Sequence, residues 1–178
     1  MSPGDVGELQ VRGPGIMKGY YKNPEATEAV FDGDWFRTGD LFRQDAKGYF
    51  YIVGRIKDTI RRSGENIAAR EVESVMMSCD LVEEAAAIPV EDETRGEEIK
   101  ALVVWQAGHT GTADDIEALI THCSSRLAGF KVPRYFETRT SLPKTGSSKI
   151  AKHVLRKEEA PLNDAVFDRR AQRKTMDA

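Results

Sequence analysis

The sequence predicts an α+β fold, and three patterns in the chain carry that prediction. Residues 8–12 alternate polar and apolar side chains with a period of two, as a half-buried strand does. Residues 101–105 form an unbroken apolar run, which is typical of a central strand covered on both faces. Val72, Val75 and Met76 recur at helical spacing and indicate a helix with one buried face. Strands and helices are therefore both expected.

Residues 1–56 contain short strand candidates separated by turns, such as those at 13–15, 32–34 and 45–48. Pieces this short cannot easily close a core of their own. We expect residues 1–56 to be the β-rich C-terminal end of a large N-terminal domain whose beginning is missing. On its own this part should expose apolar surface and promote self-association.

Residues 57–160 have the pattern of a compact second domain, with a three-stranded sheet flanked by helices and a β-hairpin. Thr112 with Asp115 three residues later predicts a capping box at a helix start. We expect residues 94–98 to be a polar, mobile connection. Residues 161–178 are polar and charged, and we expect a disordered tail. The expected helices are 69–79, a helix from 112 and 150–157, and the expected strands are 82–90, 101–105 and 135–138.

Composition narrows the function classes. The net charge is −3, so no overall basic field indicates nucleic-acid binding. No apolar run approaches the ~20 residues of a membrane span. The first residues lack the pattern of a secretory signal, which favours a cytoplasmic protein. Cys79 and Cys123 are far apart without CxxC spacing, and the three histidines form no ligand pattern. No metal site is expected.

A basic stretch dominates the middle of the chain. Arg55, Lys57, Arg61 and Arg62 lie close together around Asp58 and precede a Ser-Gly-Glu-Asn turn. Cations and bare backbone in this order suit a phosphate-bearing ligand. The alternative is a solvated basic hairpin, which charge count alone favours because such runs are usually surface.

The sequence of this stretch resembles a motif of a known family. Gly-Arg-Ile-Lys-Asp at 54–58, Ser-Gly-Glu-Asn-Ile at 63–67 and Glu-Val-Glu at 71–73 resemble the hinge motif of the adenylate-forming enzymes. That superfamily contains the acyl-CoA synthetases, the peptide-synthetase adenylation domains and firefly luciferase. The Gly-Glu-Asn motif is most similar to the corresponding motif of the CoA ligases. The resemblance covers residues 5–158 and implies the C-terminal part of an AMP-forming acyl-CoA synthetase, with 57–160 as its mobile domain.

The resemblance implies roles for residues near the expected domain boundary. Asp40 lies in a Thr-Gly-Asp string that the family uses to bind the ribose hydroxyls, although such a string alone is more often a turn. Arg55 would assist near the ribose or the α-phosphate. Lys57 matches the family's hinge position, where backbone torsion changes; without the resemblance it is a solvated lysine.

Lys149 follows a Gly/Ser-rich loop at 143–148. A loop lysine is usually just solvent-exposed, but a mobile ammonium suits a site where negative charge develops. The string resembles the family's catalytic-lysine motif, so Lys149 is the implied catalytic residue. Ser148 stands where the family usually has glycine, and serine adopts a positive φ only at a cost.

The same resemblance implies a coenzyme A path. Gly64 and Glu65 correspond to the segment that lines the pantetheine tunnel, and Phe130 is a further CoA-binding candidate. The nearby cations are weaker candidates for the CoA phosphates, and each taken alone is a surface charge. These cations are Arg61, Arg62, Lys131 and Arg134.

Together these motifs imply a ligase that joins a fatty-acid-type carboxylic acid to CoA, with ATP, Mg²⁺ and CoA in the complete enzyme and no metal ligands in this chain. The isolated chain is expected to be inactive. Two alternatives remain. One is an adenylation domain that delivers its acyl group to a carrier-protein thiol. The other is a nucleotide- or CoA-binding module without catalysis.

Overall fold

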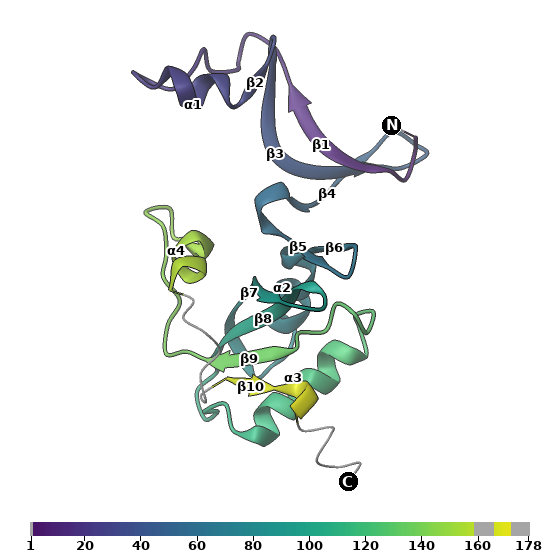
Figure 1. The fold of residues 1–178 in the computed structure, drawn as a ribbon, viewed down its shortest axis with the longest axis vertical. Coiled ribbons are helices and arrows are strands. Elements are labelled where there is room, and N and C mark those ends of the chain that lie inside the picture. Colours follow the sequence, from purple (N-terminus) through teal and green to yellow (C-terminus); the bar gives the residue numbers. More distant parts are fainter. Residues whose placement is uncertain (1, 159–165, 172–178) are drawn as a thin grey trace. The chain divides into compact units, whose positions relative to one another are not determined.

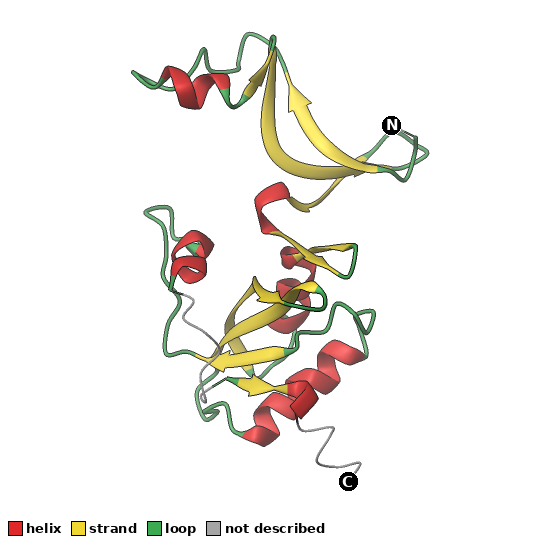
Figure 2. Ribbon diagram, in the orientation of Figure 1, coloured by secondary structure: helices red, strands yellow, loops and turns green. Residues whose placement is uncertain are grey.

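The computed structural model describes residues 2–158 and 166–171. The chain divides into two compact units, Met1–Lys57 (unit 1) and Asp58–Ala178 (unit 2). Each unit has its own sheet, drawn as arrows in Figure 1 and in yellow in Figure 2. Both strands and helices are present, so the predicted α+β class is confirmed.

Unit 1 is built on one four-stranded antiparallel sheet, in which β3 (Trp35–Gln44) is the shared partner. The strand β1 (Val6–Val11) pairs with β3, as do β2 (Phe31–Asp32) and β4 (Phe50–Arg55). The short helix α1 (Pro24–Glu28) begins at Asn23, whose side chain accepts a hydrogen bond from the Ala26 amide. Pro at the first helical position and an Asn cap are the usual signals of such a start.

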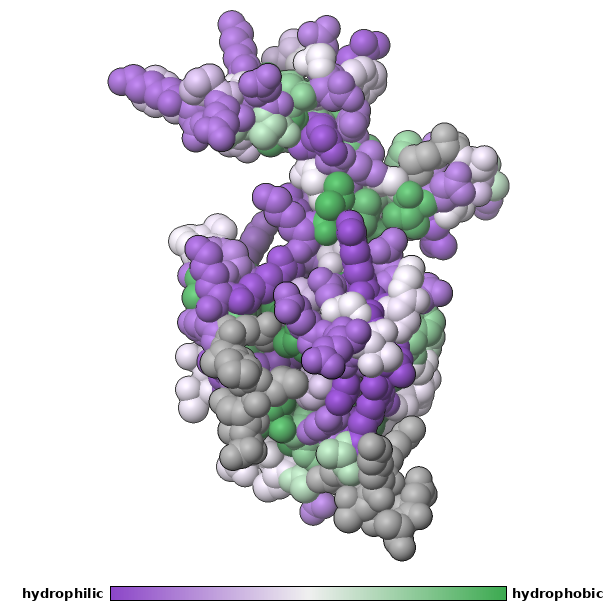
Figure 3. All heavy atoms as spheres, viewed as in Figure 1, coloured by the Kyte–Doolittle hydropathy of each residue, from purple (hydrophilic) through white to green (hydrophobic). Residues whose placement is uncertain are grey.

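Unit 1 has little apolar core. None of its described hydrophobic side chains is buried, and several large ones face solvent. Val6, Tyr49, Phe50, Tyr51 and Ile52 are between 46% and 64% exposed. Hydrophobic residues accordingly appear as green spheres at the surface of this unit in Figure 3. This sparse burial supports the expectation that residues 1–56 cannot complete a core on their own.

Unit 2 contains a six-stranded sheet centred on β8 (Gly96–Trp105). The strand β7 (Val82–Asp92) runs antiparallel to β8, and β9 (Tyr135–Thr138) runs parallel to it. The hairpin of β5 (Thr59–Arg62) and β6 (Glu65–Ala68) meets β8 at Arg62 and Gly96. Residues 98–105 are all buried, so the predicted central strand at 101–105 is confirmed.

The two faces of this sheet carry separate cores. Helices α2 (Ala69–Met77) and α3 (Ala113–Ser124) pack with β5 and β6 on the larger core, which includes Ile60, Ile67 and Leu119. The smaller core, which includes Leu142 and Leu155, lies under α4 (Lys152–Lys157). Along β7 the residues alternate between the two cores, because successive side chains of a strand point to opposite faces.

The predicted capping box at the start of α3 is confirmed. The Thr112 hydroxyl accepts from the Asp115 amide at 3.2 Å, and the Asp115 carboxylate accepts from the Thr112 amide at 3.0 Å. His109 Nδ1 lies 2.7 Å from the same carboxylate. The His109 hydrogen bond, followed by the Thr112 amide, lowers the pKa of Asp115 to about 2. These contacts stabilise the exposed first turn of the helix.

The expectation of a mobile connection at 94–98 is wrong. Residues 93–95 form a tight turn between β7 and β8, and β8 already begins at Gly96. The Asp92 carboxylate accepts from the amides of Thr94 and Arg95 at 3.1 and 2.9 Å, which fixes the turn. Glu98 is only 1% exposed. Polar composition was misleading here because Glu97 and Glu98 accept hydrogen bonds from Arg61 and Arg62, which lie 36 positions earlier in the sequence.

The expectation of a disordered tail is wrong for the part of the tail that the structure describes. Residues 166–171 contain β10 (Phe167–Asp168), which pairs antiparallel with β9. The Phe167 and Phe136 rings meet edge to face with centroids 6.4 Å apart, and Arg134 binds Asp168 at 3.0 Å. An apolar anchor and an ion pair therefore hold this segment. Residues 161–165 and 172–178 lie outside the described residues.

Candidate functional site

Two predicted nucleotide-binding residues, Asp40 and Arg55, lie opposite each other in unit 1. They are partners in the β3–β4 register, and Arg55 Nε donates to Asp40 Oδ1 at 2.5 Å. Arg55 also donates to the Thr38 carbonyl at 3.4 Å. Both side chains remain partly exposed, at 59% for Arg55 and 27% for Asp40. A carboxylate held from one side keeps acceptor capacity for two hydroxyl groups of a ligand.

Glu8, on the neighbouring strand β1, contacts residues just before Asp40, and sequence reasoning missed it. Glu8 Oε1 accepts from the Gly39 amide at 3.1 Å, and Glu8 binds Arg37 at 3.0 Å. The Thr38 hydroxyl donates to the Leu9 carbonyl at 2.7 Å. Thr38 and Gly39 of the Thr-Gly-Asp string are thus fixed to β1. The only sequence signal for Glu8 was its place in an alternating strand, which says nothing about its partner.

Lys57, the predicted hinge residue, is the last residue of unit 1 and lies in a single 3₁₀ turn, η1 (Ile56–Asp58). Its side chain is exposed and makes no hydrogen bond or ion pair with the described residues. The next residue is anchored, because Asp58 binds Arg156 at 3.0 Å and Lys152 at 3.8 Å. The first residue of unit 2 is therefore held in place directly after Lys57, whose hinge role stays a prediction.

Lys149 lies at the end of a loop closed by backbone contacts. The Thr145 amide donates to the Lys149 carbonyl at 2.7 Å, and residues 144 and 150 form an isolated bridge. Ser148, within this loop, has φ +60°, the left-handed conformation that glycine adopts without cost. The serine noted in the sequence is therefore a strained position.

The ammonium of Lys149 is exposed and has no ion-pair partner among residues 2–158 and 166–171. The two nearest lysines, in contrast, both form ion pairs. Lys144 binds Glu84, and Lys152 binds Glu73 at 2.7 Å. Burial raises the pKa of Glu73, and the Lys152 ammonium only partly offsets this. Lys149 is thus a loop lysine available to an external anion.

Gly64 and Glu65, predicted for CoA binding, lie at the β5–β6 hairpin. Ser63 and Gly64 have φ of +51° and +85°, which fits a two-residue type I′ turn. The Ser63 amide donates to the Arg95 carbonyl at 2.9 Å, so the turn is fixed to the β7–β8 connection. The Glu65 side chain is exposed. The bare backbone of Gly64 also has no atom within 4 Å of where a Cβ would lie, which leaves that face open.

Phe130 lines a pocket of about 330 Å³ together with Gly129 and four arginines. These arginines are Arg62, Arg95, Arg169 and Arg170. Gly64 and Glu65 do not line it, so the structure brings Phe130 to Arg62 but not into one pocket with the hairpin turn. A partly buried aromatic ring beside guanidinium groups suits a ligand with both a planar and an anionic part.

All four of the weaker cation candidates lie beside acidic side chains of unit 2. Lys131 binds Glu71 at 2.7 Å, and Arg134 binds Asp92 at 2.9 Å. Arg61 lines a separate concavity with the acidic residues Glu91, Asp92, Glu93 and Glu97. Arg62, expected at the surface, is only 6% exposed and binds Glu98.

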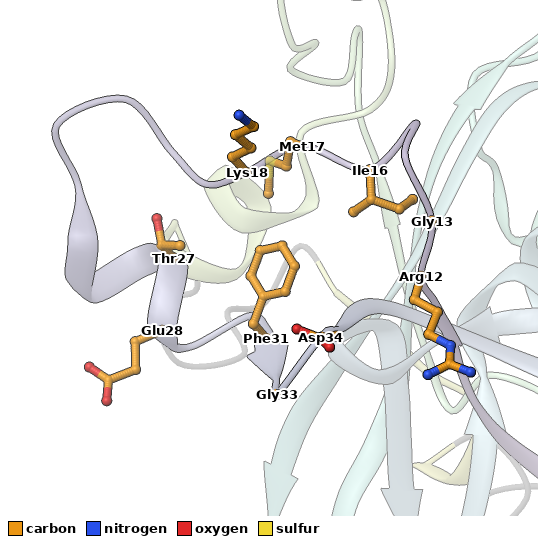
Figure 4. A pocket seen from close by; sticks show the side chains of 10 residues that line it. All are labelled: Arg12, Gly13, Ile16, Met17, Lys18, Thr27, Glu28, Phe31, Gly33 and Asp34. Carbon is orange, nitrogen blue, oxygen red and sulfur yellow. The ribbon is translucent and has the colours of Figure 1, made fainter.

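A larger concavity of about 700 Å³ lies in unit 1 and contains none of the predicted site residues. In Figure 4 the Phe31 ring lies between Met17 and Asp34, with Ile16 and Arg12 across the opening. Arg12 stacks over the Trp35 ring at 4.5 Å. This concavity is an open surface hollow bordered by charged side chains, and it adds no group to the nucleotide or CoA candidates.

Potential metal ligands and thiols in the described part of the chain lie apart or buried. No group of three or more His, Cys, Asp or Glu side chains there is arranged to hold a metal ion. Cys79 and Cys123 are buried free thiols, and burial raises the pKa of Cys123 to about 12. No helix among residues 2–158 and 166–171 has the length and apolar character needed to cross a membrane.

The comparisons with known proteins identify the region. Residues 71–149 match the AMP-binding enzyme C-terminal domain. This chain is a C-terminal region of the adenylate-forming superfamily. This chain is 43% identical over 153 residues to the oxalate–CoA ligase of Arabidopsis thaliana, a match that covers 86% of the chain. It is 41% identical over 158 residues, or 89% of the chain, to a long-chain-fatty-acid–CoA ligase of Bacillus subtilis.

A solved structure agrees with this assignment. The o-succinylbenzoate CoA synthetase from Bacillus subtilis, in complex with its acyl-adenylate intermediate, has a TM-score of 0.81 with 34% identity over 92% of this chain. This chain spans about 29% of the length of the plant ligase, 28% of the bacterial ligase and 32% of the solved chain. The matched proteins are therefore much longer than this chain.

Proposed function

We propose that this chain acts as the C-terminal portion of an ATP-dependent carboxylic acid–CoA ligase, which forms acyl-CoA through an acyl-adenylate. The observation that carries the proposal is its likeness to CoA ligases, at 41–43% identity over most of the chain. The acid is proposed to be of the fatty-acid type, in line with one of these relatives. The chain alone is proposed to be inactive, because it spans less than a third of those enzymes.

In the first half-reaction the acid's carboxylate attacks the α-phosphate of ATP, and pyrophosphate leaves. Asp40 accepts from the ribose hydroxyls, with Arg55 fixing its carboxylate. The Lys149 ammonium neutralises the charge that develops between the carboxylate and the α-phosphate. Its exposure and its lack of an ion-pair partner in the described part of the chain support this role. Mg²⁺ would arrive with ATP, and no described residue is assigned to hold it.

In the second half-reaction the CoA thiol loses its proton and attacks the carbonyl carbon of the acyl-adenylate, and AMP leaves. Rotation about Lys57 withdraws Lys149 and brings the Gly64 turn forward, with Glu65 and Phe130 along the path of CoA. The packing of unit 2 is consistent with this exchange. The loop before α4 is anchored on the smaller core through Leu142 and Ile150, whereas the β5–β6 hairpin belongs to the larger core on the other face.

The test uses a hybrid in which this chain replaces the matching region of a related CoA ligase. The Lys149→Ala variant is expected to lose acyl-adenylate formation by a factor of about 10²–10³, as removal of one transition-state donor does. It should keep thioester formation from supplied acyl-adenylate. Lys157→Ala, another exposed lysine without a described partner, is the matched control.

Equal loss of both half-reactions in Lys149→Ala would refute the division of roles. Transfer of the acyl group to a carrier-protein thiol but not to CoA would favour the adenylation-domain alternative. A hybrid that binds ATP and CoA but performs neither half-reaction would favour the non-catalytic binding module.

A further inference from the structure

Four charged side chains meet where α4 packs against the rest of unit 2, and no step of the proposed reaction uses them. The two cations, Lys152 and Arg156, come from α4. The two carboxylates come from residues far away in the sequence, Asp58 in η1 and Glu73 in α2. We call these four residues the α4 charge cluster.

Glu73 makes the shortest contacts of the cluster. Its Oε1 lies 2.7 Å from Lys152 Nζ, and its Oε2 accepts from the same ammonium at 2.8 Å. Oε1 also accepts from the Ala87 amide at 2.8 Å. Ala87 belongs to β7, whose strand neighbour in the described part of the chain is β8 alone. The Glu73 carboxylate therefore satisfies an amide of an edge strand and joins α2, β7 and α4.

Asp58 completes the cluster from the first position of unit 2. Its carboxylate accepts from Arg156 Nη2 at 3.0 Å and lies 3.8 Å from Lys152 Nζ. Lys152 and Arg156 are four positions apart in α4, so they are neighbours on one helix face, where like charges repel each other. The two carboxylates offset this repulsion and tie the helix to η1 and α2.

The helix α4 depends on such contacts because it has only six residues. Isolated helices shorter than about 12 residues are marginal in water. The residue at its N-cap, Ala151, provides no side-chain cap, and its buried residue is Leu155, which is 1% exposed. Leu155 and the α4 charge cluster are therefore the principal contacts that hold this helix against unit 2.

The loop that carries Lys149 is continuous with α4. The Ala151 amide donates to the Pro143 carbonyl at 2.8 Å, and the Thr145 amide donates to the Lys149 carbonyl at 2.7 Å. Lys152 follows Lys149 by only three positions. A shift of α4 must therefore move the backbone of Lys149, although the Lys149 ammonium itself has no ion-pair partner among residues 2–158 and 166–171.

The position of Glu73 disfavours a charge. Its side chain is 16% exposed, and burial raises its pKa, while the Lys152 ammonium and the Ala87 amide offset only part of this effect. Replacing such an ion pair by apolar residues is often neutral for stability, so stability alone does not explain this carboxylate. Groups with perturbed pKa values are concentrated at functional sites.

We propose that Glu73 is a positioning residue for Lys149, which acts by binding Lys152 and thereby holding α4 and the preceding loop in place. Asp58 assists through Arg156 and ties the same loop to η1. None of the four residues of the cluster is proposed to touch the reacting atoms. The link to acyl-adenylate formation rests on the proposed function, whereas the anchoring of the loop does not.

The first test follows amide hydrogen exchange in the 178-residue chain, which requires no catalysis. The reporters are the amides of Thr145 and Ala151, which close the loop. The variants are Lys152→Met and Glu73→Gln. Glutamine keeps an oxygen that can accept from the Ala87 amide and loses only the charge.

Three further variants serve as comparisons. Lys152→Arg keeps the cation and can bind the carboxylate. Lys157→Ala removes an exposed lysine of α4 that has no described partner. Ile120→Val lowers the stability of unit 2 from α3, on the larger core, without touching the cluster.

In Lys152→Met and Glu73→Gln, the reporter amides are expected to exchange about tenfold faster, as loss of one charge-assisted hydrogen bond implies. Lys152→Arg and Lys157→Ala should match the unmodified chain. Ile120→Val should accelerate the amides of β8, which open with the whole unit, and leave the reporter amides unchanged, because the loop opens locally.

The second test uses the hybrid ligase. Glu73→Gln and Lys152→Met should slow acyl-adenylate formation by at least about tenfold, because a small misplacement of a catalytic group lowers the rate steeply. The loss should appear in kcat and not in the KM for ATP. Thioester formation from supplied acyl-adenylate should persist, and Lys152→Arg should restore the first half-reaction.

The positioning role is overturned if the reporter amides keep their rates in Lys152→Met and Glu73→Gln, or if Ile120→Val accelerates them equally. It is also overturned if an active hybrid loses both half-reactions to the same extent in these two variants. A hybrid of the unmodified chain that forms no acyl-adenylate would instead refute the proposed function. Faster exchange at Thr145 and Ala151 would then still establish that the α4 charge cluster anchors the loop.

Discussion

Arg62 and Glu98 form a bidentate ion pair inside unit 2, where β5 meets β8. Their side chains are 7% and 1% exposed, so the pair is shielded from water. A buried charge is tolerated because its partner and its hydrogen bonds compensate the lost hydration. The pair therefore joins the β5–β6 hairpin to the central strand, and its loss should lower the free energy of unfolding.

The first prediction concerns that pair. Arg62→Met should lower the free energy of unfolding by about 3 kcal/mol, because it removes the principal partner of a buried carboxylate. Urea denaturation monitored by circular dichroism measures the change. The double variant Arg62→Met/Glu98→Met should recover much of the loss, since it leaves no fully buried charge unpaired, and Arg95 and Arg170, which also bind Glu98, are partly exposed. A single variant as stable as the unmodified chain would contradict the prediction.

A second prediction concerns pH. The pKa of Asp115 is lowered to about 2 in the folded chain, against an ordinary value of 3.8. The charged form is therefore favoured by folding, so its contribution is present above pH 3.8 and is lost as the pH falls towards 2. Asp115→Asn should be less stable than the unmodified chain at pH 6, and the difference should shrink over that window. Denaturation at several pH values tests this, and a pH-independent difference would exclude it.

A third prediction concerns backbone strain before the candidate catalytic lysine. Ser148 has φ +60°, whereas Ser147 has no positive φ. Ser148→Gly should raise stability by up to about 1 kcal/mol, because glycine adopts this conformation without the Cβ clash. Ser147→Gly should lower it slightly, since it only adds freedom to the unfolded chain. Thermal unfolding of the two variants should give shifts of opposite sign, and equal shifts would rule out strain at Ser148.

Lys57 gives a fourth prediction, which rests on the proposed function. Proline fixes φ near −65° and restricts the residue before it, so Lys57→Pro should hold the chain in one conformation at this point. In the hybrid ligase, one half-reaction should persist while the other falls by at least about tenfold. Lys57→Ala should leave both rates close to normal. Parallel loss of both half-reactions in the proline variant, measured separately, would argue against a hinge.

The fifth prediction concerns the exposed hydrophobic side chains of unit 1. Phe50 and Ile52 are 59% and 46% exposed, and nearby Tyr51 is 49% exposed. The chain should self-associate as its concentration rises, and Phe50→Ser/Ile52→Ser should reduce this. Size-exclusion chromatography with light scattering measures the mass across a concentration series. A strictly monomeric, well-folded 1–53 segment would contradict the expectation.

Local patterns predicted the elements of unit 2 well, for physical reasons. The helical spacing of Val72 and Met76, the apolar run at 101–105 and the Thr112–Asp115 pair each depend on nearby residues only. The buried position of Glu98 and the docking of Phe167 depend on partners dozens of residues away. No local pattern carries that information, so residues 94–98 were predicted to be a mobile connection and residues 161–178 a disordered tail.

In the candidate site, too, local motifs could be predicted from the sequence, whereas contacts between distant residues could not. Sequence motifs alone predicted Asp40, Lys57 and Lys149 as site residues. The structure adds the cross-strand contact of Asp40 with Arg55. Glu8 and Arg170 could not be found from the sequence, because an alternating strand and a charged tail look alike whether or not they contact a site. Their roles depend on strand register and on the pairing of β10 with β9.

The pairing of β10 with β9 also has a consequence for handling the protein. A sheet edge with unsatisfied amides and carbonyls is a template for joining another molecule, and the last six described residues cap the edge of β9. A shorter polypeptide that stops at α4 would uncover that edge together with the ring of Phe136. Ending the chain at α4 would thus expose a strand edge that can pair with other molecules.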